Sequence, residues 1–197
     1  VDKVYSFWPH GISDEARTWV VKRMEDGRIT DGKAVVMLNV SSEISLLDGI
    51  KVESVLNVEG VRVVYADNLP QVTDAKGVVT ITQDSLTLDI MAANVLANTT
   101  LTKGAITIPS FSEAAIPIII DLDIRGTAKD VATYILPQYL NKGTALNLKP
   151  DTITGKVGGK ILLQLPLYPE RAGLGTSSYD HLTLLITANF DDVSQKG

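Results

Sequence analysis

The chain of 197 residues contains no cysteine, which excludes disulfide bonds, thiolate metal sites and cysteine nucleophiles. Long hydrophobic runs are absent too. The longest apolar stretches, residues 116–120 and 161–167, are far shorter than the roughly 20 residues that a membrane-spanning helix needs. Positive charge is scarce, because 18 Lys and Arg stand against 23 Asp and Glu, for a net charge of -5. Since no basic cluster alternates with aromatic residues, we expect no nucleic-acid partner.

Large aromatic side chains are also few, with only 3 Phe and 2 Trp. Valine, isoleucine and threonine, by contrast, make up more than a quarter of the chain. These β-branched residues pack well on the pleated surface of a sheet and favour strands. The composition therefore predicts a mainly β protein with an aliphatic interior.

A helix is predicted near the start of the chain. Ser13 is a suitable N-cap, and Gly27 lies where a left-handed residue would end the helix. Between them Trp19, Val20 and Met24 fall on one face, together with Ala16. The pattern indicates an amphipathic helix that packs once against a core.

From residue 33 onward the hydrophobic period changes to two, which is typical of strands. Short links with turn residues favour antiparallel pairing in a meander. We expect a curved antiparallel sheet or groove of roughly nine strands with two short helices. The predicted strands cover residues 33–40, 50–59, 61–65, 77–82, 85–90, 101–108, 116–125, 153–165 and 182–190.

A second helix is predicted over residues 128–136, because Thr127 can cap it and Pro137 stops it. The sequence begins at Val1 without a leader, so we expect one β-rich module that is a segment of a longer protein. Its expected parts are a helical region (1–32), a β-meander (33–125), a helix (126–140), C-terminal strands (141–190) and an unstructured tail (191–197).

Few residues in the chain suit catalysis. The two histidines, His10 and His181, have no second ligand at i+2 or i+4. Asp121 and Asp123 share one strand face with Arg125, which fits a salt-linked polar face better than a cation site. Nucleophile-elbow and phosphate-loop motifs are missing. We therefore expect no catalytic residue, metal or cofactor; an enzyme would need these polar groups to converge in one pocket.

Two short helices cannot cover both faces of about nine aliphatic strands. In one interpretation the sheet folds over itself, so that its inner faces meet in a closed core. In the other it forms an open trough that acyl chains fill. Each buried methylene contributes about 0.8 kcal/mol, so a sixteen-carbon chain would gain on the order of 10 kcal/mol before ordering costs.

Strict alternation selects the residues that would line such a trough. They are the aliphatic residues at every second position of the predicted strands. The predicted lipid-binding residues are Leu86, Leu88, Ile90, Ile106, Ile108, Ile118, Ile120, Leu163, Leu165, Leu182, Leu184 and Ile186.

Several segments together resemble a domain of large AsmA-like proteins of Gram-negative bacteria. The opening carries FWPHG at 7–11, ARTWV at 16–20 and GRITDG at 27–32. The likeness continues in GVRVVYADNLP at 60–70, in the strand starts at Gly77 and Gly104, and in GKVGGKI at 155–161 followed by LPL at 165–167.

The resemblance implies a β-rich segment of a periplasmic protein that is anchored in the inner membrane by an N-terminal segment outside this sequence. Proteins of this family look like bridge-type carriers that conduct phospholipid between the inner and outer membranes. Phospholipid or fatty acyl chains are then the expected ligands, and envelope proteins are candidate partners. The alternative is a non-enzymatic structural or assembly module of the cell envelope with a closed β-core.

Overall fold

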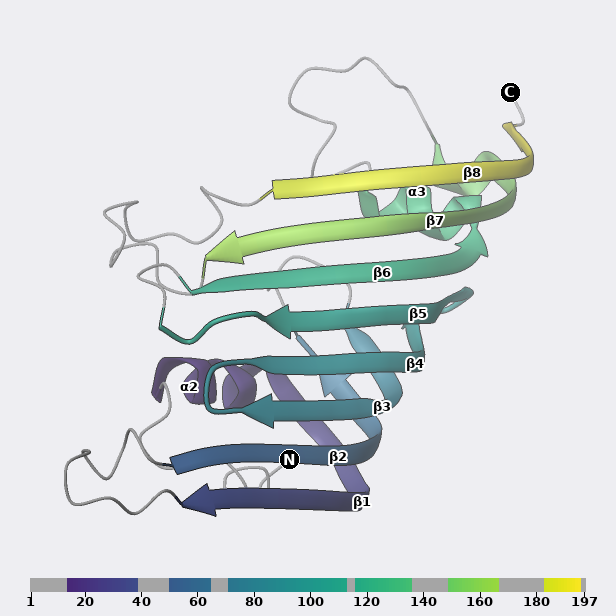
Figure 1. The fold of residues 1–197 in the computed structure, drawn as a ribbon. Helices are drawn as coiled ribbons and strands as arrows, with labels where there is room; N and C mark the ends of the chain where they lie inside the picture. The colour runs from purple at the N-terminus through teal and green to yellow at the C-terminus, as the bar shows by residue number, and fades with distance from the viewer. Residues whose placement is uncertain are drawn as a thin grey trace.

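The computed structural model describes residues 14–38, 50–64, 71–112, 116–135, 149–166 and 183–195. These residues form one sheet of eight strands in chain order, each antiparallel to the next, with two α-helices (Figure 1). The strands are β1 (Met24–Leu38), β2 (Ile50–Val63), β3 (Val72–Thr82), β4 (Leu86–Leu96), β5 (Thr99–Ile108), β6 (Pro117–Thr127), β7 (Ile153–Pro166) and β8 (Thr183–Gln195). The helices are α2 (Asp14–Arg23) and α3 (Ala128–Ile135), and a 3-10 turn, η2 (Pro150–Thr152), precedes β7.

The prediction of a mainly β, curved antiparallel sheet with two short helices is confirmed. The eight strands of the described residues are close to the roughly nine that the sequence predicts, and β2 joins the predicted segment 50–59 to the first part of the segment 61–65. Gly60 has a positive φ of 71°, and it forms a bulge in a continuous strand rather than a turn between two strands. From sequence alone, a glycine inside a strand pattern is compatible with a bulge or with a turn.

The first helix is shorter than predicted. It ends at Arg23, and β1 begins at Met24, nine residues before the predicted start at residue 33. Gly27 does have a positive φ, 80°, but so does its neighbour Asp26, at 57°. Both lie within β1, where they pair against β2 instead of capping a helix. Met24 is still buried, as its apolar pattern indicated, but from a strand.

Bulges interrupt most of the strand pairs. The register shifts between Ile29 and Asp31 in β1, between Val58 and Val61 in β2, and again within β3, β4, β5 and β7. A bulge bends its strand and increases the local twist, and the sheet is accordingly curled (Figure 1). In β4 the buried positions change from Leu88 and Ile90 to Ala93 and Val95, so the extra residue keeps apolar side chains on one face.

We call this apolar side of the sheet the inner face; it carries the largest cluster of buried side chains. Helix α2 packs on its N-terminal part, where Trp19 and Val20 join that cluster. Helix α3 packs on its other end, where Ala128 and Ala132 form a second cluster with Ile153 and Val157 of β7. Both helices therefore cover the same face, at opposite ends of the strand order.

The C-terminal region differs from the predicted unstructured tail. Strand β8 continues to Gln195, which pairs with Ile153. Gly155 and Asp192 face each other with positive φ values of 107° and 51°, and this irregularity lets the pairing continue past residue 190. Asp192 adopts a conformation that few non-glycine residues favour, which explains why an alternation rule missed it.

The predicted second helix is confirmed as α3. The backbone N–H of Asp130 donates to Oγ1 of Thr127 at 3.2 Å, so Thr127 caps the helix as expected. The last predicted position, Leu136, and the stopping residue Pro137 lie outside the described residues.

Candidate functional site

The strand register places the predicted lipid-binding residues in rows across the inner face. In the central row each residue lies directly opposite the next one on the neighbouring strand. The row contains Leu56, Val79, Leu88, Ile106, Ile120, Leu163 and Leu184, one from each strand from β2 to β8. Leu56 and Val79, which were not predicted, extend it beyond the predicted set.

The remaining predicted residues flank this row. Leu86 lies opposite Ile108, and Ile118 lies opposite Leu165. On the other side Ile90 lies opposite Gly104, and Ile186 lies opposite Ile161. Leu182 is outside the described residues. The other eleven predicted residues share one face, because the two-residue period of a strand assigns faces reliably.

Burial divides this face into two regions. Ile106, Ile108 and Ile118 are 0% exposed, whereas Leu184 and Ile186 on β8 are only half-buried. Further along β8, Phe190 lies opposite the inner residue Val157 and is 65% exposed. The inner face is thus sealed over its central strands and open along β8. We call Leu184, Ile186, Ala188 and Phe190 the β8 strip.

Under α2 the inner face is closely packed. A cavity of about 30 Å³ lies between Val20 and Met24 on one side and Leu56, Val58 and Leu88 on the other. It is entirely apolar, and its size is about that of one or two water molecules. An acyl chain therefore has no room in this part of the protein unless α2 moves away.

The carboxylates of β6 belong to the opposite, outer face. Nζ of Lys160 lies 3.6 Å from Oδ1 of Asp121 and 3.8 Å from Oδ1 of Asp123. These three groups are about half exposed, so they form the salt-linked polar face that the spacing favoured. Within the described ranges no three His, Cys, Asp or Glu residues come together as a metal site would require. His10 and His181 are outside those ranges.

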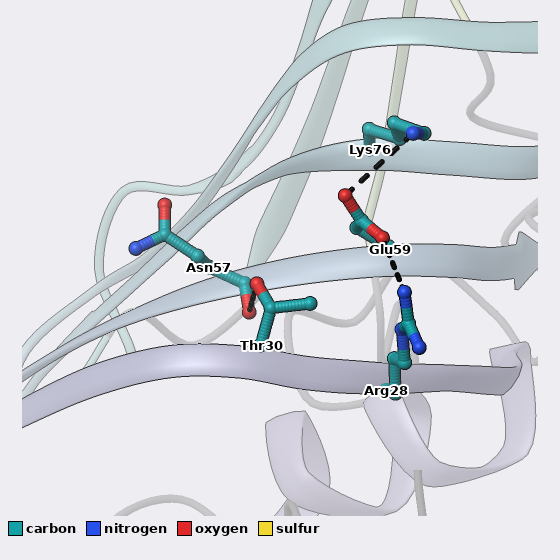
Figure 2. A network of polar contacts seen from close by, with 5 residues as sticks. All are labelled: Arg28, Thr30, Asn57, Glu59 and Lys76. Carbon is teal, nitrogen blue, oxygen red and sulfur yellow. Dashed lines mark hydrogen bonds and ion pairs between the residues drawn. The ribbon is translucent and has the colours of Figure 1, made fainter.

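A second polar network joins β1, β2 and β3 beside their bulges (Figure 2). Nη2 of Arg28 donates to Oε2 of Glu59 at 3.0 Å, and Nζ of Lys76 lies 3.6 Å from Oε1 of the same carboxylate. Nearby, Oγ1 of Thr30 donates to the carbonyl oxygen of Asn57 at 3.3 Å. The hydrogen bond from Arg28, followed by the charge of Lys76, lowers the pKa of Glu59. The network links three strands, and its three charged groups lie at the surface.

Helix α3 is attached to the turn between β4 and β5. Oδ2 of Asp130 accepts hydrogen bonds from the backbone N–H of Asn98 at 2.8 Å and from Oγ1 of Thr99 at 3.2 Å. Nζ of Lys129 lies 2.8 Å from Oδ1 of Asp151 in η2. Because Thr99 is buried, this contact fixes the position of α3 at one end of the β8 strip.

The open part of the face was only partly visible in the sequence. Ile186 and Leu184 were predicted, whereas Ala188 and Phe190 were not named as lining residues. Their signal was present, since residues 184, 186, 188 and 190 are all apolar at a period of two. What alternation cannot show is that burial decreases toward the last strand.

Comparisons with protein-family models, with curated proteins and with solved structures found no match. Among the helices that the structure describes, none combines the length and apolarity needed to span a membrane.

Proposed function

We propose that this chain is a lipid-binding β-sheet module in which acyl chains lie on the inner face, along β7 and β8. The observation that carries the proposal is the β8 strip, which continues a sealed aliphatic row into a partly exposed one. Leu184 and Ile186 stand opposite Leu163 and Ile161 of β7, so two adjacent strands present aliphatic side chains.

Aliphatic walls suit acyl chains because the hydrophobic effect is non-directional and scales with the apolar area removed from water. The outer-face charges of β6 and β7 lie on the other side of the sheet and do not interrupt the strip. An acyl chain on the strip would bury side chains that the protein itself leaves half exposed.

The resemblance to AsmA-like proteins stays a prediction, and it supplies the biological setting of the proposal. In that setting the module belongs to an inner-membrane-anchored periplasmic protein and contributes to phospholipid transport between the inner and outer membranes. The curled antiparallel sheet with one aliphatic face supports this proposal, because a groove built from many such sheets needs a continuous apolar side.

Two neighbouring residues of β8 provide a matched test. Ile186 points to the inner face, whereas Leu185, which is 56% exposed, points to the outer face. We expect delipidated protein to bind a fluorescent fatty acid, and Ile186→Asp to weaken binding at least roughly tenfold, equivalent to about 1.4 kcal/mol. Leu185→Asp should leave it unchanged.

Circular dichroism establishes that both variants are folded. A fluorescent phospholipid measured in parallel distinguishes a site for single acyl chains from one that accepts two chains and a headgroup. Failure of the unmodified protein to bind either probe, or equal losses in both variants, would refute the proposed function.

The burial of the central strands favours a second candidate, a structural or assembly module of the envelope with a closed core. Its support is that Ile106, Ile118 and Ile120 are at most 1% exposed and that the cavity under α2 holds only about 30 Å³. Native mass spectrometry of protein extracted from cells separates the two candidates. Co-purified phospholipid supports the first, and an apo mass within a stable complex of different proteins supports the second.

A further inference from the structure

At both edges of the sheet, a strand lacks a second partner among the described residues. Among the described residues β1 pairs only with β2, and β8 pairs only with β7. These are long strands, of 15 and 13 residues, and neither contains proline. Each therefore presents a row of backbone N–H and C=O groups that can template a further strand.

Exposed apolar side chains concentrate on the same two strands. In the described part of the chain seven large hydrophobic residues are exposed. Three lie on β1 and three on β8, whereas Met91, which is 63% exposed, is the only one on an interior strand. The six edge residues are Val35, Val36, Met37, Leu185, Phe190 and Val193. Charged residues, which natural edge strands commonly carry, are present on both strands. Because six of the seven exposed hydrophobic residues nevertheless lie on these two strands, the distribution indicates that the edges are contact surfaces.

The strand count sets the direction in which the edges can meet. Each of the eight strands is antiparallel to its neighbours, so β1 and β8 run in opposite directions. A second copy in the same orientation therefore offers its β1 antiparallel to the free edge of β8. The alternation of strand directions continues unbroken across such a contact.

We propose that β8 of one copy pairs with β1 of a second copy, extending the sheet. The charges favour a particular register. Lys33 of β1 and Asp191 of β8 are exposed, and neither forms an ion pair with another described residue. Placing Lys33 opposite Asp191 also places Ala34 opposite Phe190 and Val36 opposite Ala188.

In this register the inner faces of the two copies coincide. Val36 lies opposite Val52, which is on the same face of β2 as the inner residue Leu56. Phe190 belongs to the β8 strip and is therefore also on the inner face. A pairing shifted by one residue would place inner side chains of one strand opposite outer side chains of the other, so the inner faces of the two copies would no longer coincide. Pairing of β8 with another β8 would use the exposed residues of β8 but leave those of β1 uncovered.

The contact is heterologous, because two different edges meet. It consequently leaves one free edge at each end and generates open chains of copies rather than closed dimers. In this register residues 29–38 of β1 lie opposite residues 186–195 of β8. A single strand pair is smaller than the interfaces of stable complexes, so we expect weak association that depends on concentration.

This inference goes beyond the proposed function, and it is tested in delipidated protein so that lipid binding plays no part. Sedimentation velocity at increasing concentration should show association of the unmodified chain. Val36→Lys on β1 and Phe190→Lys on β8 should each weaken association at least roughly tenfold, because each places an ammonium group in the contact. Met91→Lys is the matched control, at similar exposure on β4, and should associate like the unmodified chain.

Mixing the two edge variants tests which edges meet. The Val36→Lys variant retains an intact β8, and the Phe190→Lys variant retains an intact β1, so together they should form a 1:1 dimer that neither forms alone. Lys33→Asp should weaken association, and addition of Asp191→Lys in the same chain should restore it.

Three results would overturn the proposal. The first is that the unmodified chain stays monomeric at all concentrations, which would leave a strand of another protein as the partner of the edges. The second is that Met91→Lys weakens association as much as the edge variants do. The third is that the Val36→Lys variant associates on its own, which would indicate pairing of β8 with β8. Because Ile186→Asp tests lipid binding separately, either proposal can fail without the other.

Discussion

The inner face has the same kinds of residue at its centre and at its last strand, yet the two regions differ in burial. Ile120 of β6 is 1% exposed, whereas Ile186 of β8 is half-buried and Phe190 is 65% exposed. All three occupy inner positions of the same sheet. The position of a strand within the order, rather than the chemistry of its side chains, therefore decides which aliphatic residues remain exposed.

The largest effects are expected when a charge is placed in the sealed centre of the inner face and, for comparison, on β8. Ile120→Asp buries a carboxylate without a partner in the sealed centre, and we expect a loss of more than about 4 kcal/mol in the free energy of unfolding. Ile186→Asp should cost only about 1 kcal/mol, since its carboxylate stays near water. Urea denaturation measures both values, and equal losses would contradict the division into two regions.

A pair of glycines, one on β6 and one on β7, tests the packing of β6 against its two neighbours, β5 and β7. A methyl group at Gly126 would collide with the side chain of the buried Thr99, whereas one at Gly158 finds its nearest neighbour, the carbonyl oxygen of Ile124, 3.9 Å away. Gly126→Ala should destabilise the protein by about 1 to 3 kcal/mol. Gly158→Ala should be neutral or stabilising by a few tenths of a kcal/mol, because it restricts the unfolded chain. Thermal unfolding of the two variants, measured side by side, distinguishes these outcomes.

Loss of the N-cap of α3 should loosen this helix and slightly increase the exposure of the part of the inner face that it covers. Thr127→Ala removes the acceptor of the Asp130 N–H, which typically costs about 1 kcal/mol. Hydrogen exchange of the α3 amides should become faster, and so should exchange in the facing part of β7. Thr133→Ala in the same helix, where the hydroxyl bonds only to the carbonyl of Lys129, should not accelerate exchange. Equal acceleration in both variants would exclude a specific capping role.

The smallest effect is expected at Glu59, far from the open strand. Arg28 and Lys76 hold the folded-state pKa of Glu59 below its ordinary value of 4.5. Its contribution to stability is therefore present above pH 4.5 and is lost as the pH falls through the lower folded-state pKa. Glu59→Gln should flatten the dependence of stability on pH in this acidic range. Glu53→Gln removes the same charge from β2 without breaking an ion pair between described residues, and it should leave the slope unchanged.

Sequence periodicity predicted the face of each residue but not the limits of the strands. Leu86, Leu88 and Ile90 were assigned correctly to one face because one side of a strand repeats every second residue. Residues 24–32 of β1 and 191–195 of β8 were missed, because the bulges beside Ile29, Gly60 and Asp192 break that repeat. Such bulges depend on the partner strand, and no local pattern specifies them.

The extent of burial could not be predicted for a related reason. Alternation identified Ile118 and Ile186 as equivalent, although one is sealed and the other half-buried. The difference arises from the curvature of the sheet and from where α2 and α3 lie, and both depend on contacts between residues far apart in the chain. The sequence therefore supported two alternatives, a closed core and an open trough, and the described residues contain a sealed centre beside a partly exposed last strand.

Because the number of strands is even, β1 begins and β8 ends on the same side of the sheet, seven strand spacings apart. At about 4.8 Å per spacing the strand order contributes about 34 Å to their separation, and curling shortens it. That span suits resonance energy transfer between two dyes, and a chain without native thiols accepts such labels only where cysteines are introduced. Fluorescence from a single labelled pair would then show whether a fatty acid flattens the sheet as it binds.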